Sequence, residues 1–129
     1  MKTPSDVIVV GLGYVGLPLP LALAFAAEFS TTGFDNDVTR VEQLWSGNDR
    51  NREVDAELII SSGVTFTTDE SSLKDADFIV VTVPTPVTED NLPDLSLLES
   101  ASVMIGRCLR NRSSESEAPV IVFESTTYP

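Results

Sequence analysis

Three glycines near the amino terminus follow an apolar run at the spacing Gly-x-Gly-x-x-Gly. Residues 7–10 form the run, and Gly11, Gly13 and Gly16 come directly after it. Gly11 permits the backbone angles of a tight turn, Gly13 lets the main chain approach a phosphate, and Gly16 lets a helix pack closely on a strand. Backbone N–H groups at such a strand-to-helix turn bind a pyrophosphate. Glycines also gather in ordinary turns, so the spacing alone leaves both interpretations open.

Asp35 lies at the position where a dinucleotide-binding site has a carboxylate. Residues 31–35 are expected to form a second short strand that ends at Asp35, about 20 residues beyond the glycines. An acid at this place accepts hydrogen bonds from the adenosine ribose hydroxyls and repels the 2′-phosphate of NADP. The alternative is that Asp35 and Asp37 only cap the next helix. The glycines and Asp35 together predict an NAD site.

The rest of the chain alternates between strand and helix patterns. Unbroken apolar strands indicate a parallel sheet that helices cover on both faces. We predict one α/β domain over all 129 residues, a Rossmann-type doubly wound parallel sheet with strand order 3-2-1-4-5, truncated before a sixth strand. The expected strands are 6–10, 31–35, 64–67, 78–83 and 119–123, and the main helices are 37–45, 97–109 and one that recovers after Pro18 and Pro20 and continues to about residue 29.

Two segments are expected to meet the glycine turn at the carboxyl edge of the sheet. In a doubly wound sheet the carboxyl ends of the strands line the ligand crevice. Val83, Pro84 and Thr85 follow the fourth strand, and residues 124–127 follow the fifth. Both segments should therefore border the cofactor.

The chain is strongly acidic. Its formal net charge is −12 and its sequence pI is about 4.1, which argues against nucleic acid as a partner. Of the eight basic residues only Lys2 and Lys74 are lysines. This composition suggests adaptation to high salt, and an ordinary acidic cytosolic domain is the alternative.

Cysteine usage and hydropathy bear on the compartment. Cys108 is the single cysteine, so no intrachain disulfide can form and a cytoplasmic location is the simpler inference. We expect Cys108 to be a packing residue in a helix. Histidine is absent, and we expect no metal site. The apolar run 14–27 is shorter than a membrane span and is expected to be a helix buried against the sheet, and we expect no secretory signal before the first strand.

Several segments taken together resemble the amino-terminal domain of the UDP-glucose/GDP-mannose dehydrogenase family. They are residues 11–18, 33–37 with Arg40 and Val41, 83–86, 93–95 and 124–126, in this order. The resemblance covers essentially the whole chain. The ending at residues 123–129 is more similar to the branch that oxidises UDP-N-acetylhexosamines than to the UDP-glucose branch.

The resemblance implies an activity and roles for individual residues. Family members, which serve polysaccharide biosynthesis, oxidise a primary alcohol of the sugar to a carboxylate with two NAD+, through a thiohemiacetal on a cysteine. The alternatives are that Arg40 is a solvated helix residue and that Thr85 and Thr126 only form turns. By resemblance, Gly11, Leu12, Gly13, Tyr14, Val15 and Gly16 hold the pyrophosphate, Asp35 binds the adenosine ribose, Arg40 lies at the adenine–ribose end, Val83, Pro84 and Thr85 flank a ribose, Ser125 and Thr126 approach the nicotinamide, and Thr126 is the catalytic residue that helps hold a water or oxyanion.

The chain also departs from the family pattern. Pro20 stands where small helix-forming residues are usual, and Cys108 does not match the family's nucleophile. That cysteine, its lysine and asparagine partners and the sugar-binding domain are expected beyond residue 129. The chain alone should therefore bind NAD without turnover, whereas the full-length protein should take a UDP-sugar as a homodimer; the oligomeric state of the chain alone stays open. The alternatives are a stand-alone nucleotide-binding or sensor module, and a fragment of another NAD-dependent dehydrogenase.

Overall fold

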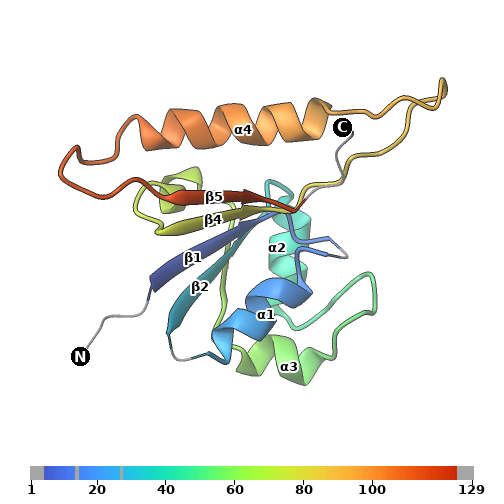
Figure 1. Cartoon of the computed structure of the whole chain (residues 1–129). Coiled ribbons are helices and arrows are strands. Elements are labelled where there is room, and N and C mark those ends of the chain that lie inside the picture. Colours follow the sequence, from blue (N-terminus) through green and yellow to red (C-terminus); the bar gives the residue numbers. More distant parts are fainter. Residues whose placement is uncertain (1–4, 14, 27, 125–129) are drawn as a thin grey trace.

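The computed structural model describes residues 5–13, 15–26 and 28–124, and its centre is a parallel five-stranded sheet (Figure 1). The strand order is β3-β2-β1-β4-β5, as the sequence predicts. All four neighbouring pairs run parallel. The strands are β1 (Ser5–Val10), β2 (Phe29–Phe34), β3 (Thr65–Thr67), β4 (Phe78–Val81) and β5 (Val120–Phe123).

Helices lie on both sides of the sheet (Figure 1). One side carries α1 (Pro18–Ala24), α2 (Val38–Trp45) and α3 (Ala56–Ser61). The other carries α4 (Ser96–Leu109), with the 3-10 helix η1 (Glu70–Leu73) packed against it. The doubly wound α/β prediction is therefore confirmed.

The central strand β1 buries side chains on both faces. Val7 and Val9 pack with Val80 on the α1 side, whereas Ile8 and Val10 join the cluster that includes buried residues of α4. Successive side chains of a strand point to opposite faces, so a strand covered twice has no polar face. This packing explains why the strand has no alternating polar positions.

The first helix is shorter than predicted. It ends at Ala24 instead of near residue 29, and β2 begins at Phe29 instead of residue 31. Phe29 pairs with Ser5 of β1, and the Ser5 N–H donates to the Glu28 carbonyl at 2.7 Å. Sheet pairing therefore overrides the helix propensity of the alanine-rich segment.

The two prolines do not disturb the interior of α1. The helix begins at Pro18, so Pro18 and Pro20 both lie in its first turn. N–H groups there have no intrahelical acceptor, and the missing proline donors cost little. The irregularity predicted for this segment takes the form of a turn over residues 15–17 before a late helix start.

Cys108 packs in the core between sheet and α4. Its side chain is buried, and its thiol donates to the Glu70 carbonyl at 3.3 Å. Burial, and then the charge of Glu70, raise the pKa of the Cys108 thiol above its ordinary value. A raised pKa disfavours the nucleophilic thiolate, so this environment agrees with a packing role.

The outer strand β5 is accessible along its whole length. Its four side chains are between 37% and 51% exposed, although all four are apolar. Figure 1 shows β5 at the end of the sheet beside β4.

Among the helices of the described segments, none has the length and apolar character to cross a bilayer.

Candidate functional site

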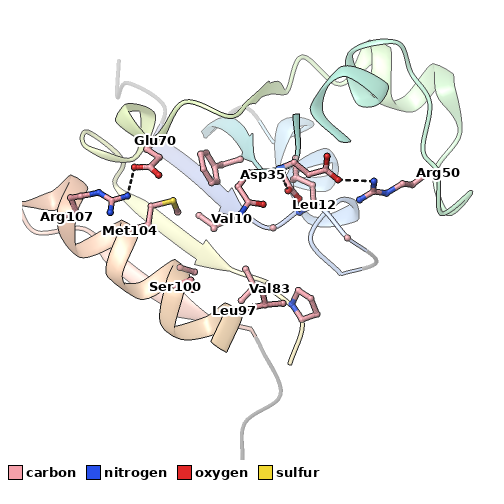
Figure 2. A pocket seen from close by; sticks show the side chains of 17 residues that line it. Val10, Leu12, Asp35, Arg50, Glu70, Val83, Leu97, Ser100, Met104 and Arg107 are labelled. Atoms are coloured by element: carbon pink, nitrogen blue, oxygen red, sulfur yellow. Dashed lines mark hydrogen bonds and ion pairs between the residues drawn. The ribbon is translucent and has the colours of Figure 1, made fainter. Parts of the chain in front are cut away.

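A hollow of about 510 Å³ opens at the carboxyl ends of β1, β2 and β4 (Figure 2). Its lining includes Val10 at the end of β1, Gly11 directly after it, Asp35 after β2, and Val83 and Pro84 after β4. One wall comes from α4. The predicted meeting of the strand ends at one edge is therefore confirmed for these three strands.

The glycine turn at the base of the hollow requires glycine at two positions. Gly11 has φ +98°, a conformation that other residues rarely adopt. A Cβ on Gly16 would overlap the carbonyl of Gly11 and the hydroxyl of Thr82. A Cβ on Gly13 would meet nothing within 4 Å, and Gly13 lines the hollow. The turn therefore has no space for a side chain at Gly16, whereas it has free space at Gly13, which lines the hollow.

Thr82 fixes the turn from the end of β4. Its hydroxyl donates to the Gly11 carbonyl at 2.7 Å, and its N–H donates to the Val10 carbonyl at 2.9 Å. The sequence analysis missed Thr82, since one threonine at the end of an apolar strand carries no distinguishing pattern. It ties the end of β4 to the glycine turn.

Asp35 lies half-buried at the hollow and holds two backbone groups. Its Oδ2 accepts from Leu12 N–H at 2.9 Å, and its Oδ1 accepts from Asp37 N–H at 2.9 Å. A carboxylate has about four acceptor sites, so lone pairs remain for ribose hydroxyls. The N-cap of α2 is Asp37, which accepts from Arg40 N–H at 3.2 Å. Capping therefore explains Asp37 and leaves Asp35 for another role.

Arg40 lies beneath the turn and outside the lining of the hollow. The residue is 0% exposed, which excludes the alternative of a solvated helix residue. Its Nε donates to the Leu12 carbonyl at 2.7 Å, and its Nη1 donates to Asp49 at 2.9 Å. Arg40 therefore contacts the turn through the Leu12 carbonyl and does not line the hollow.

Asp49 organises the loop that follows α2. It accepts N–H bonds from Asn51, Glu53 and Val54 besides its bond from Arg40. Burial by itself raises the pKa of Asp49, but these four hydrogen bonds outweigh it, so the net shift lowers the pKa below 3.8. The ionised form is the one that the folded protein stabilises.

Replacing Asp49 by asparagine should cost about 3 kcal/mol of folding free energy at neutral pH, since it leaves the buried Arg40 charge without its partner. A folded-state pKa below the unfolded value gives stability that is present above the unfolded pKa of 3.8 and lost as pH falls through the folded value. The difference between wild type and Asp49→Asn should therefore shrink in acid. Urea unfolding across this pH range measures it, with the exposed Asp90→Asn as control; a constant difference would contradict the assignment.

An ion pair that the sequence analysis missed lies at the rim. Arg50 Nη1 lies 3.0 Å from Asp37 Oδ2, and both residues line the hollow (Figure 2). The hydrogen bond from Arg50, followed by the N–H of Arg40, lowers the pKa of Asp37. Arg50 belongs to a polar segment without periodicity, so only the fold brings it here.

The sequence pattern also did not identify α4 as a wall of the hollow. Leu97, Ala101 and Met104 face the hollow at helical spacing, and Arg107 pairs with Glu70 at 2.7 Å at its far end (Figure 2). The same spacing is typical of a helix facing a core. The sequence pattern therefore does not separate a ligand wall from ordinary packing.

The structure brings together part of the predicted set of site residues. The hollow is lined by Gly11, Leu12, Gly13, Asp35, Val83 and Pro84. Outside this lining lie Val15, Gly16, Arg40 and Thr85. The remaining predicted residues, Tyr14, Ser125 and Thr126, fall outside the described residues.

No group of three or more His, Cys, Asp or Glu able to hold a metal ion occurs in the described ranges.

The fold and the site define a class of protein. A doubly wound parallel sheet with a glycine turn after β1 and an acid after β2 is a Rossmann-type dinucleotide-binding domain. Comparison with known proteins adds the family. Residues 5–129 match the model of the UDP-glucose/GDP-mannose dehydrogenase family, NAD binding domain, and the chain belongs to this family.

Relatives and solved structures agree with this assignment. The chain is 42% identical to the UDP-N-acetyl-D-glucosamine 6-dehydrogenase of Pseudomonas aeruginosa over 95% of its length, and 37% identical to Protein CapL of Staphylococcus aureus over 96%. A GDP-mannose dehydrogenase structure from P. aeruginosa has a TM-score of 0.84 at 27% identity and covers 95% of the chain. The chain spans 28%, 27% and 29% of these three proteins, respectively.

The residues present fit NAD, the cofactor of this domain. The open face of Gly13 leaves room for a phosphate beside the main chain, and the Asp35 carboxylate faces the same hollow. The apolar side chains of Leu97 and Met104 suit the flat face of a base. These three features line one cavity.

Proposed function

We propose that the chain is the cofactor-binding part of a longer nucleotide-sugar dehydrogenase. The intact enzyme would oxidise the C6 alcohol of a UDP-sugar, of the UDP-N-acetylhexosamine or UDP-glucose type, to a carboxylate with two NAD+. The observation that carries this proposal is the common hollow of the glycine turn and Asp35 in a chain of this family. The 42% identical UDP-N-acetyl-D-glucosamine 6-dehydrogenase of Pseudomonas aeruginosa supports the N-acetylhexosamine type.

In this proposal the chain binds and orients NAD. Residues 11–16 hold the pyrophosphate, Asp35 accepts from the adenosine ribose, and residues 83–85 border a ribose. Bound NAD supplies the acceptor for the hydride that leaves the sugar alcohol. Ser125 would approach the nicotinamide and Thr126 would help hold a water or oxyanion, since a hydroxyl can donate to a developing negative oxygen.

The nucleophilic cysteine would belong to the longer protein. The intact enzyme would act in the cytoplasm, in polysaccharide biosynthesis, as a homodimer. Cys108 is buried in the core, and its position does not suit attack on a sugar aldehyde.

The longer gene product tests the activity. Incubated with UDP-N-acetylglucosamine and NAD, it should release two NADH for each sugar oxidised, and UDP-glucose should react more slowly. Residues 1–129 alone serve as the control and should bind NAD without forming NADH. A gene that stops after codon 129 would contradict the proposal and favour a stand-alone nucleotide-binding module.

Salt should stabilise this chain. We propose adaptation to high salt, because a net charge of −12 with two lysines implies repulsion that ions screen. The free energy of unfolding from urea titration should rise as KCl increases to molar concentration. Sucrose at matched osmolality controls for solute exclusion, and stability that does not increase in KCl would refute the proposal.

A further inference from the structure

Charged side chains bind both backbone polar groups of Leu12, which lines the hollow. Its N–H donates to Asp35 Oδ2 at 2.9 Å, and its carbonyl accepts from Arg40 Nε at 2.7 Å. The Arg40 bond is buried, with the guanidinium enclosed beneath the turn. Each of these two partners is charged, and hydrogen bonds to charged groups are the strong ones.

The direction of the Leu12 carbonyl sets the direction of the next N–H. A trans peptide is planar, so the Leu12 carbonyl and the Gly13 N–H point in opposite directions. The Leu12 carbonyl points to Arg40, a residue outside the lining of the hollow. The Gly13 N–H therefore points the other way, at a residue that lines the hollow and has open space around it.

Arg40 also connects the turn to the rim of the hollow. Its Nη1 donates to Asp49 at 2.9 Å, and both side chains are 1% exposed. Asp49 in turn holds the backbone of residues 51–54, next to the rim residue Arg50. Within the described residues Nη2 has no hydrogen-bond partner, so Nε and Nη1 carry the connection.

We propose that Arg40 is a positioning residue for the pyrophosphate of NAD. It orients the Gly13 N–H toward the phosphates by holding the Leu12 carbonyl, and Asp49 holds Arg40 in place. This inference rests on the proposed NAD function. It gives Arg40 a different role from contact with the adenosine ribose, because the guanidinium is enclosed and lies outside the lining of the hollow.

A series of ligands separates positioning of the phosphate from contact with the ribose. Arg40→Lys keeps the charge but loses the planar fork that reaches two acceptors. We expect the Kd of ADP and NAD, measured by calorimetry, to rise about tenfold in this variant. This is the value of one charge-assisted hydrogen bond, the bond from the Gly13 N–H to a phosphate of the ligand. The Kd of adenosine, measured by NMR titration, should change by less than about twofold, since adenosine has no phosphate.

The matched control is Arg112→Lys. Arg112 also donates to backbone carbonyls, those of Lys74, Ala76 and Glu117, away from the hollow lining. This variant should bind all three ligands as the wild type does. An equal loss of adenosine and ADP affinity in Arg40→Lys, or no loss of either, would overturn the proposal.

The wild type gives a second measurement that needs no variant. Its Gly13 amide resonance should shift on addition of ADP and stay nearly unchanged on addition of adenosine. A Gly13 amide that ignores ADP while ADP binds would overturn the positioning role alone. Failure of the wild type to bind NAD or ADP would overturn the proposed function and this inference together.

Discussion

Replacing Asp35 by alanine is expected to weaken NAD binding by about 1–3 kcal/mol, or about 5- to 150-fold, because hydrogen bonds accepted by a carboxylate are lost. Asp35 is half-buried at the hollow, and its two oxygens already fix the N–H groups of Leu12 and Asp37. The variant therefore removes both the proposed ribose acceptor and one support of the glycine turn. Calorimetric titration with NAD measures the loss.

Asp37→Asn is the control for this experiment. It removes a neighbouring charge at the same rim, and asparagine is also a good N-cap, so α2 keeps its start. NAD affinity should fall much less in Asp37→Asn than in Asp35→Ala. Wild-type affinity in Asp35→Ala would contradict the ribose role.

The second large effect is expected for Gly16→Ala. The added methyl group would overlap the Gly11 carbonyl and the Thr82 hydroxyl, which are hydrogen-bonded to each other. We expect a loss of about 3 kcal/mol in the free energy of unfolding, the upper part of the range for an overpacked core, with loss of NAD binding. Urea unfolding and calorimetry measure the two effects.

Alanine substitutions at two other glycines serve as comparisons for Gly16→Ala. The methyl group added in Gly13→Ala would meet nothing within 4 Å, so the fold should persist. The same methyl group should obstruct the approach of a phosphate to the main chain. Gly106→Ala lies in α4 with open space around it and should bind NAD normally, with stability raised by about 0.5–1 kcal/mol. If Gly16→Ala were as stable as the wild type, the tight packing inferred at this turn would be wrong.

The sheet could be predicted because its cause is local. Strands buried on both faces, such as β1 and β4, are continuous apolar runs, and Asp35 and Pro84 show where two strands end at the same edge. Chain order and the right-handed crossover rule then leave few topologies. The start of β2 was missed because pairing with β1 decides it, and the alanine-rich segment before it favours helix.

The site could be predicted only in part because much of it depends on pairing between distant residues. Arg40 occupies a polar position in an amphipathic helix, and only the Leu12 carbonyl and Asp49, 28 and 9 residues away, make its burial favourable. Arg50 and the α4 wall reach the hollow through the same tertiary arrangement. Their sequence patterns are those of a surface loop and a packing helix.

We propose that the glycine turn and Asp35 together select NAD, and a titration of residues 1–129 with NAD and NADP tests this selection most directly. We expect saturable binding of one NAD per chain and a Kd for NADP at least about tenfold higher, because Asp35 would lie against the 2′-phosphate. Equal affinity for the two dinucleotides, or no heat with either, would contradict it.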